Sequence, residues 1–171
     1  MTVARIVPKD SLTSHMPERL RRVDRIFQRL PIYFVTACTD ERRHILNDAD
    51  VHAQLIEYGK RGADYGAWLG AYVLMPDHLH AFVVIDDQRL SLSMLMKSLK
   101  NALSRTLRQR CIPSPHWQKG FFDHILRSEE SYGEKWSYVR ENPVRAGLVK
   151  QWEEWPFVGE IFDLEFRDDP F

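Results

Sequence analysis

Two β-rich runs joined by a very short connection constrain the fold more than any other feature of this sequence. Residues Ala67 to Met75 and Leu79 to Ile85 are rich in β-branched and aromatic side chains, and little more than Pro76-Asp77-His78 separates them. Proline followed by aspartate is typical of a tight turn. The sequence therefore predicts a β-hairpin whose two strands are antiparallel neighbours in a sheet.

Periodicity and boundary residues predict elements on both sides of this hairpin. In chain order these are a strand at Ile32–Cys38, a helix from Asn47 or Asp48 to about Arg61, a helix from Ser91 or Ser93 to about Arg110, a strand at Phe121–Leu126, and a helix from Ser128 to near Asn142, before Pro143. The order strand, helix, strand, strand, helix, strand predicts an α+β protein with a ferredoxin-like βαββαβ antiparallel sheet, helices on one face and an additional C-terminal helix.

The 171 residues fit one domain of ordinary size. We expect an Arg-rich N-terminal leader at residues 1–30, the folded domain at 31–157 and an acidic C-terminal tail at 158–171. The N-terminus lacks the apolar core of a signal peptide, and no run of apolar residues is long enough to span a membrane. Cys38 and Cys111 have no CxxC spacing, so we expect a cytoplasmic protein without a membrane partner.

Charge is distributed unevenly along the chain. The formal net charge is zero, which taken alone argues against a nucleic-acid partner. From Arg89 to Lys150, however, there are 12 Lys plus Arg against 5 Asp plus Glu, whereas residues 151–171 hold 1 against 7. This asymmetry is consistent with a polyanionic partner, and equally with two solvated surfaces on opposite sides of one domain.

Two histidines provide the first candidate site. His78 and His80 are separated by one residue at the start of a predicted strand, so their side chains leave the same face of the sheet and can converge on one ion. Imidazole is a good ligand for divalent transition metals. An isolated His-x-His is also common as a pair that only completes a sheet face, so these residues do not settle the question by themselves.

A tyrosine and an asparagine on the last predicted helix provide the second candidate site. Tyr138 and Asn142 are four residues apart and share one helix face, so a phenol and an amide oxygen can point into one pocket. Tyr132 is a second candidate nucleophile, but its position six residues earlier turns it away from Asn142. Tyr138 also fits a core or rim position, and Asn142 fits a helix C-cap.

Three ordered motifs carry a family resemblance. The segments MPDHLHAFVVI, WQKGFFDHILR and YVRENPVRAGLV resemble, in that order, the REP-associated tyrosine transposases, which belong to the HUH nuclease class. The resemblance extends from about Tyr33 to Pro156 and makes residues 31–157 an HUH-type catalytic domain. It implies that Mg²⁺ or Mn²⁺ is bound by His78, His80 and Asn142, and that Tyr138 is the nucleophile. Insertion-sequence relatives usually have glutamine at the position of Asn142, so Asp123 or His124 remains an alternative third ligand.

The resemblance also implies a substrate and a reaction. The substrate is single-stranded, hairpin-forming palindromic DNA, cleaved by Tyr138 through a 5′-phosphotyrosine with a free 3′-hydroxyl. Candidate DNA contacts are basic residues of the second half of the chain, namely Lys97, Lys100, Arg105, Lys119, Arg127 and Arg145. Trp117 fits a stacking position or a core position, and the arginines of the leader (Arg19, Arg21, Arg22 and Arg25) fit a clamp on the duplex stem or an unrelated surface helix.

Two other functions are also compatible with the sequence. Ferredoxin-like sheets often bind RNA through exposed aromatics on two central strands, although the strands around Tyr72 and Phe82 lack the aromatic-rich signature. A domesticated transposase would bind palindromes without mobilising DNA. The sequence also leaves open whether the protein is a monomer or a homodimer.

Overall fold

The computed structural model describes residues 2–8, 30–127 and 129–168. Its elements are, in chain order, β1 Thr2–Pro8, β2 Ile32–Cys38, η1 Asp40–Arg42, α2 Ala49–Gly62, η2 Ala63–Tyr65, β3 Ala67–Leu74, β4 His78–Ile85, α3 Leu92–Gln109, β5 Phe122–Leu126, α4 Glu129–Arg140, α5 Asn142–Arg145, η3 Trp152–Glu154, β6 Val158–Glu160 and β7 Phe162–Asp168. The predicted hairpin is confirmed as β3 and β4, and the predicted order from β2 to β5 is confirmed as well.

The main sheet is antiparallel and has the order β5-β2-β4-β3-β6. Its first four members are the strands of the predicted ferredoxin-like unit, and β6 extends the sheet at the β3 edge. The register places Thr36 opposite His80 and Cys38 opposite His78, so these four side chains share one face of the sheet. The α+β fold class is therefore confirmed.

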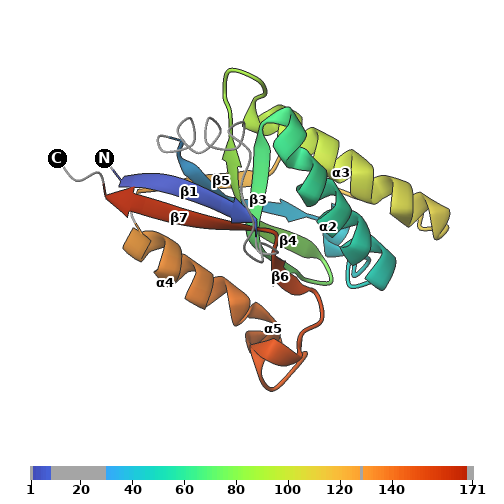
Figure 1. Cartoon of the computed structure of the whole chain (residues 1–171). Helices are drawn as coiled ribbons and strands as arrows, with labels where there is room; N and C mark the ends of the chain where they lie inside the picture. Colours follow the sequence, from blue (N-terminus) through green and yellow to red (C-terminus); the bar gives the residue numbers. More distant parts are fainter. Residues whose placement is uncertain (1, 9–29, 128, 169–171) are drawn as a thin grey trace.

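The two long helices cover one face of this sheet. Asp48 caps α2 because its Oδ1 accepts the backbone N–H of Asp50 at 2.9 Å, and Ser91 caps α3 by accepting from Met94 N at 3.2 Å. Leu55 of α2 and Leu99 of α3 are buried against Val83 of β4 in one hydrophobic core. Figure 1 shows α2 and α3 side by side on this face and α4 on the other.

Helix α4 packs on the opposite face through one stripe of its surface. The ring of Tyr132 lies 4.6 Å from that of Phe82, and the ring of Trp136 lies 6.2 Å from it, measured between centroids. Val139, one turn further on, is buried with Trp155. This i, i+4, i+7 stripe determines which residues of α4 are left to face the sheet edge where the histidines lie.

The C-terminal end of α4 differs in detail from the prediction. The helix ends at Arg140, and Asn142 begins a second short helix, α5, instead of ending the first. Pro143 lies in the first turn of α5, where its missing N–H removes no helical hydrogen bond. The break before the proline therefore occurs about two residues earlier than the sequence suggests, and Asn142 keeps a helical position beyond it.

Strands are present in both terminal segments, the expected leader at residues 1–30 and the expected acidic tail at residues 158–171. β1 pairs with β7 in a separate two-stranded antiparallel sheet, and β6 pairs with β3. Residues 9–29, which include the four arginines of the predicted clamp, lie outside the described residues. Within the residues that are described, no helix is both long and apolar enough to cross a membrane.

The strand β7 is part of the hydrophobic core. Leu164 is buried with Phe162 against Trp68 and Phe82, and it sits directly over Gly70, where an added Cβ would lie only 2.5 Å from Leu164 Cδ1. A residue larger than glycine at position 70 would therefore push β7 away from β3.

Truncating Leu164 tests this packing. We expect Leu164→Ala to lower the free energy of unfolding by about 2–4 kcal/mol, because it removes buried methyl groups and leaves a cavity. The matched control Leu148→Ala removes an exposed leucine and should change stability by less than about 0.5 kcal/mol. Urea titration followed by circular dichroism measures both values, and equal effects would show that β7 does not belong to the folded core.

Candidate active site

The two predicted histidines lie together on β4. The ring centroids of His78 and His80 are 4.6 Å apart, with the planes nearly perpendicular. Both side chains are partly buried, and Phe34 of β2 stacks on His80 at 5.3 Å. The alternation of a strand thus brings the two imidazoles to one side, as the sequence predicts.

Each histidine has a hydrogen-bond partner at Nδ1. Asp77 Oδ1 lies 2.6 Å from His78 Nδ1, and Thr36 Oγ1 lies 2.7 Å from His80 Nδ1. Arg42 Nη2 is also 3.3 Å from His78 Nδ1, but the shorter contact with a carboxylate assigns the Nδ1 proton to the bond with Asp77. His78 therefore keeps Nε2 for another ligand, and His80 does so in the tautomer whose Nδ1–H donates to Thr36 Oγ1, which is the arrangement of metal-binding histidines.

Burial and positive neighbours keep both imidazoles neutral. Burial lowers the pKa of His80 to about 3, helped by the positive charges near it, including Lys135 and Arg145. Burial also lowers the pKa of His78, although the bond with Asp77 opposes this shift. Since a neutral imidazole has a free lone pair, both rings are in the form that binds a metal near neutral pH.

A partly buried carboxylate and an arginine orient His78. Burial alone raises the pKa of Asp77, but its hydrogen bond with His78 and the charge of Arg42 outweigh burial and lower the pKa overall. Arg42 Nε donates to Asp77 Oδ2 at 2.7 Å. Sequence reasoning missed both residues as part of the site, although the position of Asp77 immediately before His78 was a visible signal. Thr36 had no such signal, because only the strand register brings it to His80.

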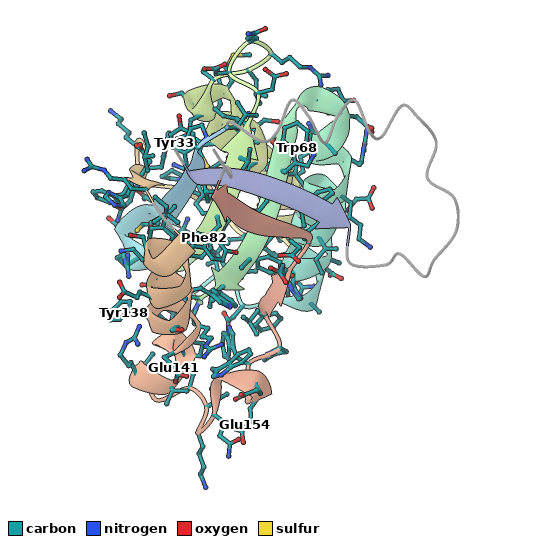
Figure 2. All side chains as sticks on the ribbon, turned by 60° about the vertical axis from the view of Figure 1, so that its left-hand side comes forward. Tyr33, Trp68, Phe82, Tyr138, Glu141 and Glu154 are labelled. Carbon is teal, nitrogen blue, oxygen red and sulfur yellow. The ribbon has the colours of Figure 1, made fainter. Side chains whose placement is uncertain are left out.

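The structure separates the two candidate tyrosines. Tyr132 packs on Phe82, and burial raises the pKa of its hydroxyl well above the usual value. Tyr138 is 64% exposed and lines a pocket together with both histidines. In Figure 2 it lies on α4, below the β1–β7 sheet. Tyr138 is therefore accessible to a large substrate beside the histidine pair, whereas Tyr132 is occupied in packing.

Asn142 and Arg145 lie next to Tyr138 in the same pocket. The guanidinium carbon of Arg145 is 4.0 Å from the centroid of the Tyr138 ring, and Arg145 Nη2 donates to the Tyr138 backbone oxygen at 2.6 Å. The same nitrogen donates to Asn142 Oδ1. A metal ion can bind Asn142 Oδ1 only after Arg145 has released this oxygen, because the ion and the guanidinium group would repel each other there.

The pocket has a volume of about 460 Å³ and combines residues of both halves of the chain. Its lining residues come from β2, the β3–β4 hairpin, α4 and α5, and are Phe34, Met75, His78, His80, Lys135, Tyr138, Val139, Asn142, Arg145 and Ala146. Cations and neutral polar groups are present, and no carboxylate is among the described residues that line it. Such a lining is suited to an anion.

The alternative third ligands lie elsewhere. Asp123 is paired with Val35, so its side chain leaves the sheet on the α2–α3 face, away from the histidines. His124 shares a row with Phe34 on the histidine face, but it is exposed and does not line the pocket. No group of three or more His, Cys, Asp and Glu side chains among the described residues is placed to hold a metal. Asn142 is therefore the candidate that the fold brings to the pair.

Most of the candidate DNA contacts lie outside the pocket. Arg145 lines it, whereas Lys97, Lys100 and Arg105 are on α3, on the opposite face of the sheet. Lys119 and Arg127 are exposed at the two ends of β5. Of the candidate DNA contacts, only Arg145 therefore lies beside Tyr138, while three others form a basic surface on α3.

Lys100 and Trp117 hold a loop in place. Lys100 Nζ donates to the carbonyl oxygens of Gln118, at 3.1 Å, and Gly120. Trp117 Nε1 donates to Lys100 O at 3.2 Å and to Ser104 Oγ at 3.0 Å. Both side chains therefore anchor the segment that leads into β5, which favours the core position that the sequence left open for Trp117.

The role of Lys100 can be checked by its effect on stability. We expect Lys100→Ala to lower the free energy of unfolding by about 1–2 kcal/mol, because it removes charge-assisted hydrogen bonds to two carbonyl groups. Lys97→Ala, an exposed residue of the same helix, should leave the stability unchanged within about 0.5 kcal/mol. Thermal melts of both variants measure the difference. Identical melting temperatures would show that Lys100 does not stabilise the loop.

Comparisons of the sequence and the fold with known proteins show which protein family this chain is similar to. A family described as "Transposase IS200 like" matches residues 28–141. The chain is 28% identical over 89 residues to a REP-associated tyrosine transposase of Escherichia coli (strain K12), an alignment that covers 52% of each protein. It is 23% identical over 143 residues to a putative REP-associated tyrosine transposase of Haemophilus influenzae, covering 78% of this chain and 81% of that one.

A solved structure shares the fold. A REP-associated tyrosine transposase bound to a REP hairpin superimposes with a TM-score of 0.63 at 26% identity, covering 75% of each chain. This chain belongs to the IS200-like transposase family. Within that family it resembles the REP-associated tyrosine transposases, as its three sequence motifs predict. The match to the E. coli relative spans about half of that protein's length.

Proposed function

We propose that this protein cleaves and rejoins single-stranded, hairpin-forming DNA through a covalent 5′-phosphotyrosine on Tyr138. One observation carries the proposal: Tyr138, His78 and His80 line the same pocket, although the tyrosine lies 58 positions after the second histidine in the sequence. A solved relative of this fold is bound to a REP hairpin, which supports hairpin DNA as the substrate class.

Tyr138 acts as nucleophile in an in-line displacement at phosphorus. Its phenolic oxygen forms a new bond to phosphorus, the bond to the 3′-oxygen breaks, the phenolic proton passes to solvent, and the released 3′-oxygen takes up a proton. The number of phosphodiester bonds is unchanged, so a 3′-hydroxyl of another strand can reverse the step without an external energy source. Such reversal rejoins DNA.

The residues around Tyr138 fit a divalent cation. With Nδ1 of each ring hydrogen-bonded to Asp77 or Thr36, the Nε2 atoms of His78 and His80 can hold a ligand, and Asn142 of the same pocket supplies an amide oxygen. Mg²⁺ or Mn²⁺ held there polarises the scissile phosphate as a Lewis acid when bound. Arg145, which contacts both Tyr138 and Asn142, is placed to exchange Asn142 for an oxygen of the phosphate.

The basic residues outside the pocket serve DNA binding in this proposal. Lys97 and Arg105 on α3 and Lys119 and Arg127 beside β5 are exposed, so they can contact phosphates of the flanking strand or stem. Lys100 contributes indirectly, since its ammonium group holds the 118–120 loop. Phosphate contacts of this kind weaken with salt and do not depend on sequence.

The test is a covalent-capture assay. Purified protein is incubated with end-labelled single-stranded hairpin oligonucleotides and Mn²⁺, and the products are separated on a denaturing gel. We expect label that migrates with the protein and disappears after protease treatment. Cleavage without an adduct would mean that water attacks, and the absence of both cleavage and adduct would leave DNA binding without chemistry.

The structure disfavours the RNA-binding alternative. Tyr72 of β3 and Phe82 of β4 are buried, at 2% and 0% exposure, so the central strands present neither aromatic to a base. Helices α2 and α3 cover one face of the sheet, and α4 with β7 covers the other. The open aromatic platform that such modules use is therefore not formed by these strands.

A further inference from the structure

Lys135 is a cation of the pocket that the sequence motifs do not single out. It lies on α4, three residues before Tyr138, so the two side chains are neighbours on one face of the helix. It lines the same pocket as Tyr138, His80 and Arg145. The residue is half-buried, unlike the exposed lysines of α3 such as Lys97.

An aromatic ring holds the ammonium group of Lys135 beside the histidines. Lys135 Nζ is 5.1 Å from the centroid of the Phe34 ring, and the same ring stacks on His80 at 5.3 Å. Phe34 therefore contacts both the lysine and the imidazole. This contact positions the charge without neutralising it, because an aromatic face attracts a cation but carries no net charge.

The charge of Lys135 is left available for a ligand. Among the residues whose side chains are described, the ion pairs join Arg42 with Asp77, His78 with Asp77, and Arg110 with Asp48 and Asp50, and none involves Lys135. None of the described residues that line the pocket carries a carboxylate. A half-buried cation without a counterion is costly unless an anion completes the site.

We infer that Lys135 binds a nonbridging oxygen of the phosphate that Tyr138 attacks. This inference rests on the proposed function and adds a phosphate-binding residue to it. Lys135 and Arg145 reach the pocket from α4 and α5, on the two sides of Tyr138 in the sequence. A phosphate held between them lies next to the phenol, and the positive charges oppose the negative charge that develops on its oxygens during attack.

Binding measurements test the inference without relying on catalysis. The variants Lys135→Met, which keeps the packing of the side chain on Phe34 but removes the charge, and Lys135→Arg, which keeps the charge, are compared in EDTA with a fluorescent hairpin oligonucleotide. We expect Lys135→Met to weaken affinity several-fold and to reduce the slope of log affinity against log salt by about 0.7, as for one lost contact to a single strand. Lys135→Arg should retain most of the affinity and most of the salt dependence of the wild type.

A matched control and a rate measurement separate the possible outcomes. Lys60→Met removes an exposed lysine of α2, on the other face of the sheet, and should change neither affinity nor slope. At saturating DNA, Lys135→Met should slow adduct formation by about 10²-fold or more. Affinity and slope equal to those of Lys60→Met would overturn the inference. If the wild type forms no adduct, the proposed reaction fails, and the binding data alone decide the role of Lys135.

Discussion

Replacing Tyr138 with phenylalanine is expected to abolish the covalent protein–DNA adduct while leaving DNA binding intact. The change removes one hydroxyl from a side chain that is 64% exposed, so neither the core nor the contact of Arg145 with the ring face depends on it. Loss of a nucleophile typically reduces the rate by a factor on the order of 10³ or more. The measurement is the covalent-capture assay, with affinity for the same hairpin determined in parallel.

Two other tyrosines make this experiment specific. Tyr65→Phe is the matched control, because Tyr65 is 63% exposed and lies beside α2, away from the histidines. Tyr132→Phe tests the second candidate nucleophile, whose hydroxyl is buried near Phe82. Both variants should form the adduct. An adduct that persists in Tyr138→Phe and is lost in Tyr132→Phe would reverse the assignment.

Removing both imidazoles is the second change with a large expected effect. We expect His78→Ala/His80→Ala to lose Mn²⁺ binding and to reduce DNA cleavage to background, because none of the other described residues that line the pocket carries an imidazole. Isothermal titration with Mn²⁺ measures the first effect and the capture assay measures the second. His44→Ala, an exposed histidine, is the control and should match the wild type in both.

Two further variants distinguish the ligands from the residues that orient them. Asp77→Asn keeps the shape of the side chain but removes the carboxylate that accepts from His78, and such changes usually cost about 10–100-fold in metal affinity or activity. His124→Ala should have no effect, since His124 does not line the pocket. Wild-type metal dependence in the double alanine variant would show that the ion is bound elsewhere or is not needed.

Local sequence patterns were sufficient to predict most elements of the main sheet. The short Pro76-Asp77 connection leaves an antiparallel hairpin as the simplest outcome, and the caps at Asp48 and Ser91 mark where α2 and α3 begin. These features depend on residues a few positions apart, so they can be recognised without knowledge of the fold. The placement of His78 and His80 on one side of a strand follows from the same local periodicity.

Local sequence patterns did not predict the strands at the two ends of the chain. Residues 158–168 appear only as an acidic segment in the sequence, yet they contain β6 and β7, and Leu164 is buried over Gly70. The partner of β7 is β1, more than 150 residues earlier. Pairing between such distant segments depends on the shape of the finished core, which no local pattern encodes.

The sequence by itself determined the chemical groups of the candidate site and the family to which they belong. Only the tertiary structure decided which of these groups meet: it placed Tyr138 in the pocket and Tyr132 in the core, removed Asp123 to the other face of the sheet, and brought Thr36 and Lys135 to His80. The physical reason is that the packing of Tyr132, Trp136 and Val139 sets the rotation of α4 on the sheet. That rotation in turn selects the residues that face the histidines.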